Sequence, residues 1–392
     1  MTGGPIDVFM IAGEDSGDQL GSHLMDALMK RHRGPVAFRG VGGPRMEARN
    51  FTSRFPMAEI ALFGITSIIV HIPNVLRRVR ETVQEIVDNP PSVLVLIDCP
   101  GFNRRVARQV RKLRPDIPIV FYVSPTVWAW RPGRAAEMRP YVDHLLALLP
   151  FEPEVHRRLG GPDCTYVGHP ISERLPELRP DPVEARRRGE APPLVLVLPG
   201  SRRQEILRLS PLFEKVIERT TARLGEIDWV LPAVPQHRAL IEETIAGWPV
   251  RPRIVDGEMA KFSAFRLARA ALACSGTVTL ELAVAGVPQV VAYRTGWLEA
   301  QIARRLITAE TAVLANLVIG EKVVPEFLQE FATVDAVTEA LIPVIAGGAD
   351  RDRQLAAFSR LDAIMDFAGR DPSDKASEIV LQTLARRAVA LA

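Results

Sequence analysis

The strongest constraint on the fold is the stretch at residues 93–103, VLVLIDCPGFN, where a continuous apolar run ends in an aspartate and a Pro-Gly pair. An apolar run of this length, bounded by turn residues, is typical of a strand buried on both faces of a parallel sheet. Asp98 would then lie at the carboxyl end of that strand, where open α/β sheets bind ligands. Two interpretations remain open here. Asp98 either takes a proton at the mouth of a crevice, or it only caps the helix beginning near Phe102.

The chain has 392 residues, which is too long for one hydrophobic core, so two domains are expected. Between them, prolines punctuate a charged stretch with few large apolar residues, at positions 170, 176, 180, 182, 192 and 193. This composition predicts a linker. The expected parts are an N-terminal domain over 1–170, a linker over 171–193, a C-terminal domain over 194–345, and a helical tail over 346–392.

Composition excludes several classes of protein. The net charge of +3 is too small to indicate general nucleic-acid binding. Cys99, Cys164 and Cys274 are far apart and lack CxxC spacing, so neither a disulfide framework nor a zinc site is predicted, and a reducing cytoplasm fits. The first residues do not resemble a signal peptide, and no apolar run reaches the roughly 18 residues that suggest a membrane span.

The first half opens with an apolar strand at 6–12, a glycine-containing turn and a helical pattern over 20–29, as in a Rossmann-like unit. The glycine spacing is not GxGxxG. The turn also carries Glu14, Asp15 and Asp18, which do not suit a pyrophosphate. These carboxylates could accept hydrogen bonds from sugar hydroxyls, or they could merely cap the helix.

Two other stretches of the first half point to ligands. Trp128, Trp130 and Arg131 follow an expected strand at 117–123 and suggest a binding wall. Residues 63–80 are apolar and then basic, as in a segment that lies in a membrane interface with arginines on anionic headgroups. A second basic run over 104–114 also favours contact with a membrane. The alternative for 63–80 is a buried helix followed by a solvated face.

The second half repeats the strand-turn-helix pattern twice. After a strand at 194–198, Ser201 and Arg202 open a helix where backbone N–H groups and a guanidinium suit a phosphate. After a strand at 270–274, small polar residues again open a helix: Ser275, Gly276 and Thr277. Glu281 follows and could hold the two hydroxyls of a ribose, although a serine cap with a capping-box glutamate explains part of this pattern.

A donor nucleotide held by the second half and an acceptor held by the first describe a GT-B glycosyltransferase. That fold has two Rossmann-like α/β domains whose parallel sheets face across a cleft. Its need for metal is low, because helix N-termini and arginine can replace a cation at the leaving diphosphate. In the tail, Asp350 and Asp352 form a nominal DxD, but no apolar strand precedes them, so they indicate a helix start.

Eight motifs, in order, resemble those of the lipid-A-disaccharide synthase family and span roughly residues 6–330. They are AGEDSGD at 12–18, GVGGPRM at 40–46, IDCPGFN at 97–103, VSPTVWAWR at 123–131, PFE at 150–152, VGHP at 167–170, LPGSRR at 198–203 and SGTVTLE at 275–281. One departure is Asp15, where the family more often has alanine.

The resemblance implies an inverting transfer of sugar from UDP-2,3-diacylglucosamine to 2,3-diacylglucosamine 1-phosphate, giving lipid A disaccharide 1-phosphate and UDP without a cofactor or metal. It implies that Asp98 is the general base. Implied acceptor or sugar contacts are Glu14, Ser16, Asp18 and Trp128. Implied nucleotide contacts are Ser201, Arg202, Ser275, Gly276, Thr277, Glu281, Asn316, Glu326 and Gln329.

Because both substrates carry acyl chains, the resemblance also implies a peripheral protein on the cytoplasmic face of the inner membrane. The implied membrane contacts are Ile68, Ile69, Val70, Arg77, Arg78 and Arg80. Two alternatives remain open. One is a GT-B enzyme of the UDP-N-acetylglucosamine 2-epimerase kind, which leaves 63–80 unexplained, and the other is a non-catalytic UDP-sugar-binding membrane adaptor. The C-terminal helix is expected to pack on the N-terminal domain, of its own chain or of a homodimer partner.

Overall fold

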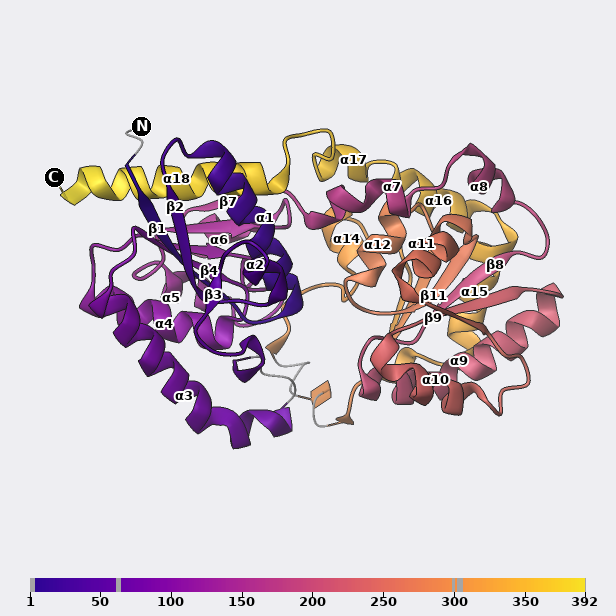
Figure 1. Ribbon diagram of the computed structural model, residues 1–392. Helices are drawn as coiled ribbons and strands as arrows, with labels where there is room; N and C mark the ends of the chain where they lie inside the picture. Colours follow the sequence, from indigo (N-terminus) through magenta and orange to yellow (C-terminus); the bar gives the residue numbers. More distant parts are fainter. Residues whose placement is uncertain (1–3, 61–64, 298–299, 302–305, 392) are drawn as a thin grey trace. The chain divides into compact units, whose positions relative to one another are not determined.

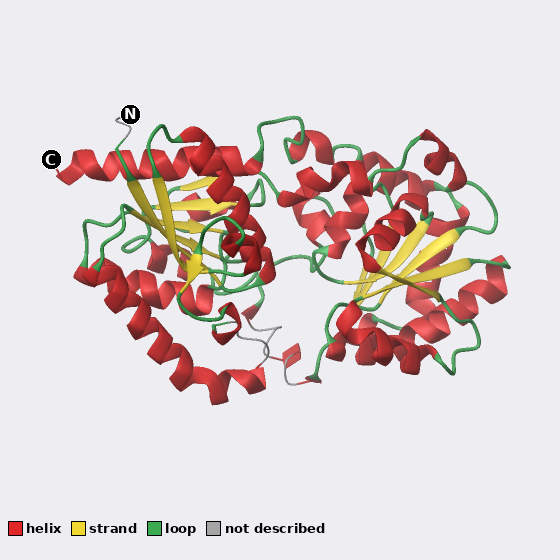
Figure 2. Ribbon diagram, in the orientation of Figure 1, coloured by secondary structure: helices red, strands yellow, loops and turns green. Residues whose placement is uncertain are grey.

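The computed structural model describes residues 4–60, 65–297, 300–301 and 306–391 and divides into two compact α/β units (Figure 1). Unit 1 consists of Met1–Pro170 with Phe367–Ala392, and unit 2 of Ile171–Asp366. In each unit a sheet is covered by helices on both faces (Figure 2).

Unit 1 is built on a seven-stranded sheet of order β3-β2-β1-β4-β5-β6-β7, and all of its pairs are parallel. Its elements are β1 (Ile6–Ala12), α1 (Asp15–Arg31), β2 (Val36–Val41), α2 (Pro44–Glu47), β3 (Thr52–Ser53), η1 (Met57–Glu59), α3 (Ile65–Asp88), β4 (Val93–Ile97), α4 (Pro100–Leu113), β5 (Ile119–Tyr122), α5 (Arg134–Met138), β6 (His144–Ala147), α6 (Glu152–Arg158), β7 (Cys164–Tyr166) and α18 (Pro372–Leu391).

Unit 2 is built on a six-stranded parallel sheet of order β10-β9-β8-β11-β12-β13. Its elements are η2 (Pro170–Arg174), α7 (Leu175–Leu178), α8 (Pro182–Arg187), β8 (Leu194–Leu198), α9 (Arg203–Leu224), β9 (Asp228–Ala233), η3 (Pro235–His237), α10 (Arg238–Ile245), β10 (Arg253–Asp256), α11 (Gly257–Leu267), β11 (Ala270–Cys274), α12 (Val278–Val284), β12 (Gln289–Tyr293), α14 (Leu314–Ile319), β13 (Glu326–Leu328), η4 (Gln329–Phe331), α15 (Val334–Ala346), α16 (Ala349–Phe358) and α17 (Leu361–Ile364).

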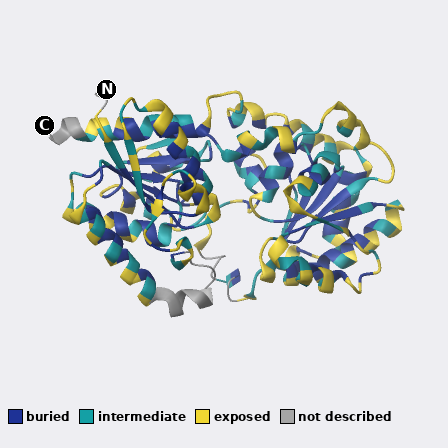
Figure 3. Ribbon diagram, viewed as in Figure 1, coloured by how far each residue is buried: buried dark blue, intermediate teal, exposed yellow. Residues whose placement is uncertain are grey.

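The central strands are buried on both faces (Figure 3). Along β1, Val8 and Met10 pack with α1 and α18, whereas Phe9 and Ile11 pack with α3 and α4. Every residue of β4 and β11 is buried, as their continuous apolar sequences predict. The expected strands at 6–12, 194–198 and 270–274 have the predicted ends, and the Rossmann-like parallel architecture is confirmed.

Residues 171–193, expected as a linker, are ordered within unit 2 and hold η2, α7 and α8. The Arg188 side chain explains why this proline-rich stretch packs tightly. It donates to the main-chain carbonyls of Phe265, Arg266, Ala285 and Gly286, near the ends of α11 and α12. Carbonyls at the end of a helix are short of intrahelical donors, so one guanidinium can supply hydrogen bonds to several of them.

The expected tail over 346–392 is divided between the units. In α16, Gln354 exchanges two hydrogen bonds with the main chain of Gln289, so this helix belongs to unit 2. Asp350 and Asp352 lie in its first turn, as expected of a helix start. In contrast, α18 packs along α1, and Ala376 and Val380 join the core of unit 1. The C-terminal helix therefore packs on the N-terminal unit of its own chain.

Candidate active site

Asp98 follows β4 directly, at the carboxyl edge of the sheet of unit 1. Its main-chain N–H donates to the carbonyl of Tyr122 in β5 at 2.8 Å. The N-cap of α4 is Cys99 and no side chain caps this helix, so the alternative that Asp98 is the cap is not what the structure shows. The carboxyl group of Asp98 is therefore left at the edge where ligands bind parallel sheets.

The chain leaves β4 in a strained conformation. Asp98 and Cys99 have φ values of +49° and +43°, a left-handed region that side chains other than glycine rarely adopt. The Asn103 amide holds this turn by donating to the carbonyls of Ile97 and Asp98 at 3.1 and 2.8 Å. Strain kept in place by such bonds is concentrated at functional sites.

Burial raises the pKa of the Asp98 carboxyl above its ordinary value, and a hydrogen bond from the main chain of Cys99 opposes the shift in part. A raised pKa makes a carboxylate a stronger proton acceptor. Burial likewise raises the pKa of the Cys99 thiol to about 12, so this thiol stays protonated. Cys99 is an inert packing residue, and Asp98 is the group at this turn suited to proton transfer.

The acidic turn between β1 and α1 lies beside Cys99. A Cβ on Gly13 would come within 2.7 Å of the Cys99 side chain, so only glycine allows the two turns to approach this closely. Glu14 is the N-cap residue of α1, and Ser16 is exposed in the first turn. Both expected acceptor contacts thus lie on the edge that carries Asp98.

Asp18 has a different environment from that expected of a sugar contact. Its side chain is 2% exposed, and its carboxylate accepts from the N–H groups of Gly43, Arg45 and Met46 at 2.8–3.1 Å. It therefore holds the 40–46 loop against α1. A Cβ on Gly43 would lie 2.8 Å from this carboxylate, which explains why glycine stands there.

Trp128 lies in the loop after β5 and is held by Glu152, a residue that the sequence reasoning did not single out for chemistry. The indole N–H donates to Glu152 Oε1 at 3.2 Å, and the ring meets Phe151 edge-on at 5.5 Å between centroids. Glu152 is 3% exposed, and its second oxygen accepts from the N–H of Leu149 at 3.0 Å. Burial raises the pKa of Glu152 to about 7.

A second buried pair supports the same loop. The Ser124 hydroxyl lies 2.8 Å from His156 Nε2, and both residues are buried. Burial lowers the pKa of His156 to about 4, so the ring is neutral at physiological pH. The PFE motif at 150–152 was visible in the sequence, but a lone glutamate near two prolines gives no signal of burial.

In unit 2 a cavity of about 470 Å³ opens at the carboxyl ends of β8 and β11. Most of the expected nucleotide contacts line it: Ser201, Arg202, Ser275, Gly276, Thr277 and Glu281. Apolar residues complete it from the end of β9 and the turn that follows: Pro232, Ala233, Val234 and Pro235. Gly200 and Gly276 have φ values of +118° and +151°, so the two turns that bound it depend on glycine.

Glu205 occupies the N–H groups that the sequence assigned to a phosphate. Its Oε2 accepts from the N–H groups of Ser201 and Arg202 at 3.1 and 3.2 Å, and Arg202 also donates to Oε1 at 3.2 Å. A Cβ on Gly200 would lie 2.5 Å from that of Glu205. The Arg202 side chain remains 80% exposed, which leaves its other donors accessible.

Glu281 is paired within the cavity. Lys261 donates to Glu281 Oε2 at 2.8 Å, and the ammonium also lies 5.1 and 5.2 Å from the ring centroids of Phe262 and Phe265. The pair holds the Glu281 carboxylate in one orientation. Lys261 was not identified from the sequence, because it lies in α11 with no neighbouring motif.

A second cavity of about 620 Å³ shares Arg202, Glu205 and Ser275 with the first. Its remaining lining is largely apolar and includes Tyr293, Ile307, Leu328 and Phe331. Gln329 lines this cavity and accepts from the N–H of Thr295 at 3.3 Å.

Asn316 and Glu326, expected on the donor side, bind the protein's own main chain. Asn316 is 2% exposed and accepts from Val323 and Val324 at 3.1 and 2.9 Å. Glu326 accepts from the N–H of Ala312 at 2.8 Å, and the carbonyl of Ala312 receives the Ser275 hydroxyl at 2.5 Å. These side chains thus order the loops around the cavities, and neither lines one of the described cavities.

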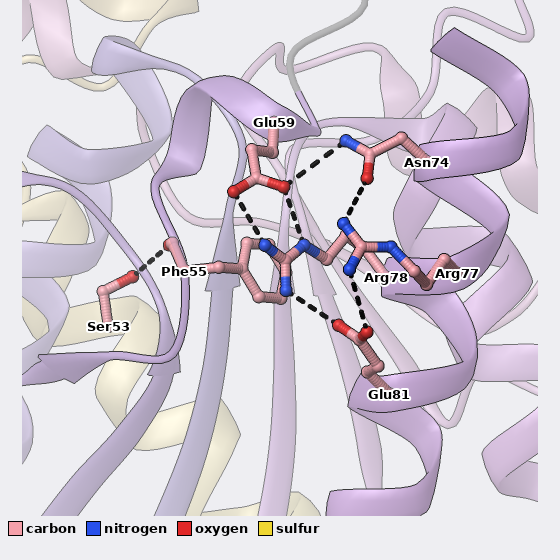
Figure 4. A network of polar contacts seen from close by, with 7 residues as sticks. All are labelled: Ser53, Phe55, Glu59, Asn74, Arg77, Arg78 and Glu81. Atoms are coloured by element: carbon pink, nitrogen blue, oxygen red, sulfur yellow. Dashed lines mark hydrogen bonds and ion pairs between the residues drawn. The ribbon is translucent and has the colours of Figure 1, made fainter.

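On α3 the arginines differ from one another (Figure 4). Arg78 forms a two-bond ion pair with Glu59 at 2.7 Å, contacts Glu81 at 2.8 Å and lies 4.5 Å from the centre of the Phe55 ring. The expectation that Arg78 meets lipid headgroups is therefore not supported, because its charge is used to anchor α3. The Arg78 ion pair lowers the pKa of Glu59.

Arg77 is 58% exposed on its side chain and contacts Asn74 and Glu81, while Arg80 is exposed. The side chains of residues 61–72, with the expected membrane contacts Ile68, Ile69 and Val70, lie outside the described residues. In the basic run of α4, Arg104 and Arg108 pair with Glu137, and Arg111 pairs with Asp143. Much of that run therefore stabilises unit 1.

Within the described part of the chain, no group of three or more His, Cys, Asp or Glu residues is arranged to hold a metal ion. Nor does any helix there combine the length and apolar character needed to cross a membrane.

The sequence model described as lipid-A-disaccharide synthetase matches residues 8–380. The chain belongs to the lipid-A-disaccharide synthase family. The relative of that name from Rhodopseudomonas palustris (strain BisB18) is 53% identical over 384 residues, covering 98% of this chain and 97% of its own. The relative from Nitrobacter hamburgensis is 52% identical and covers 96% of this chain and 95% of its own. The protein is thus a glycosyltransferase of lipid A biosynthesis.

Solved structures that resemble this chain agree with a GT-B fold. The UDP-GlcNAc 2-epimerase of Neisseria meningitidis, bound to UDP-GlcNAc, has a TM-score of 0.58 at 11% identity and covers 98% of this chain and 100% of its own. MurG of Acinetobacter baumannii has a TM-score of 0.57 at 12% identity and covers 96% of this chain and 99% of its own. At this identity the likeness concerns the fold alone. The family match, and not the fold, separates the chain from the epimerases.

Proposed function

We propose that the protein transfers the sugar of UDP-2,3-diacylglucosamine to the 6-hydroxyl of 2,3-diacylglucosamine 1-phosphate with inversion. A new C–O bond forms at the anomeric carbon as the bond to UDP breaks, and the hydroxyl proton leaves to a base. The observation that carries the proposal is the cavity of unit 2, where a guanidinium, main-chain N–H groups and a paired carboxylate line one concave site.

In this proposal Asp98 accepts the proton of the attacking hydroxyl. Its position after β4 and its burial support the role, since burial raises its pKa above that of an ordinary aspartate. The strained turn fixes the direction of the carboxyl group before substrate arrives, and such preorganisation lowers the barrier to reaction.

The UDP moiety occupies the cavity of about 470 Å³. Arg202 and the N–H groups near Ser275 meet the developing charge on the leaving diphosphate. The Glu281 carboxylate, oriented by Lys261, accepts hydrogen bonds from the ribose hydroxyls. The second cavity, which shares Arg202 and Ser275, receives the donor's glucosamine and acyl groups, and its apolar lining suits them.

On unit 1, Glu14, Ser16 and Trp128 contact the acceptor sugar. Asp18 acts as a positioning residue through the 40–46 loop, and Glu152 positions Trp128. Asn316 and Glu326 order the walls of the donor site in the same way.

The acyl chains of both substrates require access to a bilayer. We infer that the protein binds the cytoplasmic face of the inner membrane through α3, with Ile68, Ile69, Val70, Arg77 and Arg80 as contacts. An apolar segment followed by exposed arginines is suited to an anionic interface. Neither a homodimer nor a cofactor is required for the reaction as written. Because cationic and N–H donors line the diphosphate site, we also propose that the reaction is metal-independent.

The decisive experiment uses purified protein with synthetic donor and acceptor of defined acyl chains, before and after treatment with EDTA. Equal release of UDP and formation of the β-1,6-linked disaccharide are expected, with unchanged rates in EDTA. Absence of UDP release with every acylated glucosamine pair would contradict the transfer, and loss of activity in EDTA alone would contradict only metal independence.

A further inference from the structure

Two arginines, one in the loop after β5 and one at the start of α5, stack on one indole ring. The Cζ atoms of Arg131 and Arg134 lie 4.8 and 4.3 Å from the centre of the Trp130 ring. Arg131 is exposed and Arg134 is half-buried. Within the described residues neither forms an ion pair, so the ring, and not an acid, holds both guanidinium groups.

The surroundings of these guanidiniums are positively charged. Arg104 lies close enough to lower the pKa of Arg134, as does Arg131, although burial is the larger cause. Glu137 and the Tyr141 phenol oppose this lowering of the pKa, and the Glu137 carboxylate is already bound by Arg104 at 3.0 Å and by Arg108 at 3.1 Å. Cations held together without sufficient counter-charge favour an anion from outside.

The location of the cluster relates it to the reaction. Its loop leaves β5, and the last residue of β5, Tyr122, accepts the N–H of Asp98. Arg104 lies in α4, which begins at Pro100 directly after the Asp98 turn. At a rise of about 1.5 Å per residue, Arg104 lies within about 6 Å of the start of that helix. The cluster therefore lies on the sheet edge that carries Asp98.

We propose that Arg131 and Arg134, stacked on Trp130 and joined by Arg104, bind the phosphomonoester of the lipid acceptor. A phosphomonoester carries a charge of about −1.5 to −2 at neutral pH and presents three acceptor oxygens. Planar guanidiniums bind such a group through pairs of hydrogen bonds, and stacking on a ring fixes their planes in advance. This inference rests on the proposed function, since it names the part of the acceptor that unit 1 selects.

The site distinguishes the acceptor from the same sugar lacking phosphate. Its contacts act on the acceptor alone, so they leave binding of UDP to unit 2 unchanged. They also orient the acceptor, because a group fixed at C1 limits the positions that the 6-hydroxyl can take near Asp98.

The test compares two acceptors, 2,3-diacylglucosamine with and without the 1-phosphate, in neutral detergent micelles that contain no anionic lipid. For the R131Q/R134Q variant we expect kcat/KM with the phosphorylated acceptor to fall about tenfold to hundredfold, and kcat/KM with the other acceptor to change about twofold or less. Arg134→Lys, which keeps the charge but loses the planar fork, should lie between the variant and the wild type.

Arg139→Gln is the matched control, because Arg139 is an exposed arginine just after α5 that does not stack on Trp130. Its kcat/KM should equal that of the wild type for both acceptors. UDP affinity, measured by calorimetry, should be unchanged in all variants and reports that each is folded.

Equal losses with both acceptors, or no loss with either, would overturn the phosphate site. If the variant lost activity only on vesicles containing phosphatidylglycerol, the arginines would bind phospholipid headgroups, and the proposal would also be wrong. Failure of the wild type to transfer sugar to the phosphorylated acceptor would instead refute the proposed function.

Discussion

The turns that bound the two candidate sites are built in opposite ways. In unit 1, Asp98, Cys99 and Val123 follow β4 and β5 with φ values of +49°, +43° and +75°, although none is glycine. In unit 2, Gly200 and Gly276 follow β8 and β11 at +118° and +151°. The first edge carries side chains on strained turns, while the second makes its turns with glycine and has no side chain at these two positions.

The difference agrees with the chemistry proposed for each edge. A proton acceptor has to be a side chain, and a strained turn that costs about 1–2 kcal/mol per residue fixes its direction. A diphosphate is better bound by several N–H groups at once, which requires glycine where a Cβ would intrude. The four predictions below test this contrast, in order of decreasing effect.

The largest effect is expected for Asp98→Asn. Asparagine tolerates the left-handed conformation, so the turn should survive while the base is lost. We expect kcat to fall about 10²- to 10⁴-fold with unchanged UDP affinity, measured by steady-state kinetics and calorimetry. In the wild type the rate should rise with pH as Asp98 loses its proton, above the pH at which an ordinary aspartate does so.

Asp116→Asn is the control, since Asp116 precedes β5 at the opposite edge of the sheet and pairs with Arg114. Its activity should match the wild type. If a folded Asp98→Asn variant turned over at the wild-type rate, Asp98 would not be the base. The proposed difference between the sheet edges of unit 1 and unit 2 would then be wrong.

Glu152 provides a pH-dependent test of unit 1. Its pKa is raised from 4.5 to about 7, so the folded state binds its proton more tightly than the unfolded state. The stabilisation from protonation is therefore complete below pH 4.5 and lost as the pH rises through about 7. The change is on the order of 3 kcal/mol. Glu152→Gln should abolish this part of the decrease in unfolding free energy between pH 5 and 8, measured with urea.

The exposed Glu154 on the same helix serves as the control, because Glu154→Gln should keep the wild-type pH dependence. If the free energy of unfolding of Glu152→Gln still fell with pH as in the wild type, another group would determine the pH dependence of unit 1.

Arg202→Ala tests the unit 2 edge. We expect UDP affinity to fall about tenfold to hundredfold, because a charge-assisted contact to the diphosphate is lost. Thermal stability should change little, since the Arg202 side chain is 80% exposed. Arg203→Ala, a change at the neighbouring exposed arginine, should leave affinity close to that of the wild type. Equal affinities for the two variants would indicate that the N–H groups alone hold the diphosphate.

The smallest effects concern α3 of unit 1. Arg77→Ser with Arg80→Ser should weaken flotation with anionic vesicles at low salt by about tenfold, since an arginine near such a surface contributes up to about 1 kcal/mol and Arg77 is partly neutralised by Glu81. Arg78→Ser should instead lower the stability of unit 1 by about 1 kcal/mol through loss of the Glu59 pair and the contact with Phe55. If Arg77→Ser with Arg80→Ser lowered the stability and Arg78→Ser weakened flotation, the roles assigned to these arginines would be wrong.

Much of the fold and part of the site could be predicted from local sequence. The continuous apolar runs of β4, β8 and β11 and the small residues after them predict buried parallel strands and their ligand edge. By contrast, β3 has two residues and β13 has three, too few for any periodicity to show. The prediction of a linker relied on the prolines and charges of residues 171–193. It missed that Arg188 binds main-chain carbonyls at the ends of α11 and α12, because those helices are far away in the sequence.

The sequence by itself determined the fold class, the family and the position of Asp98, because each of these depends on short runs of neighbouring residues. Only the tertiary structure decided which polar side chains are bound by the protein itself. Asp18 and Arg78 were expected to meet ligands, but other segments of unit 1 supply their partners. A buried polar group must find such partners to offset the loss of water, and residues far apart in sequence make this choice only when the fold brings them together.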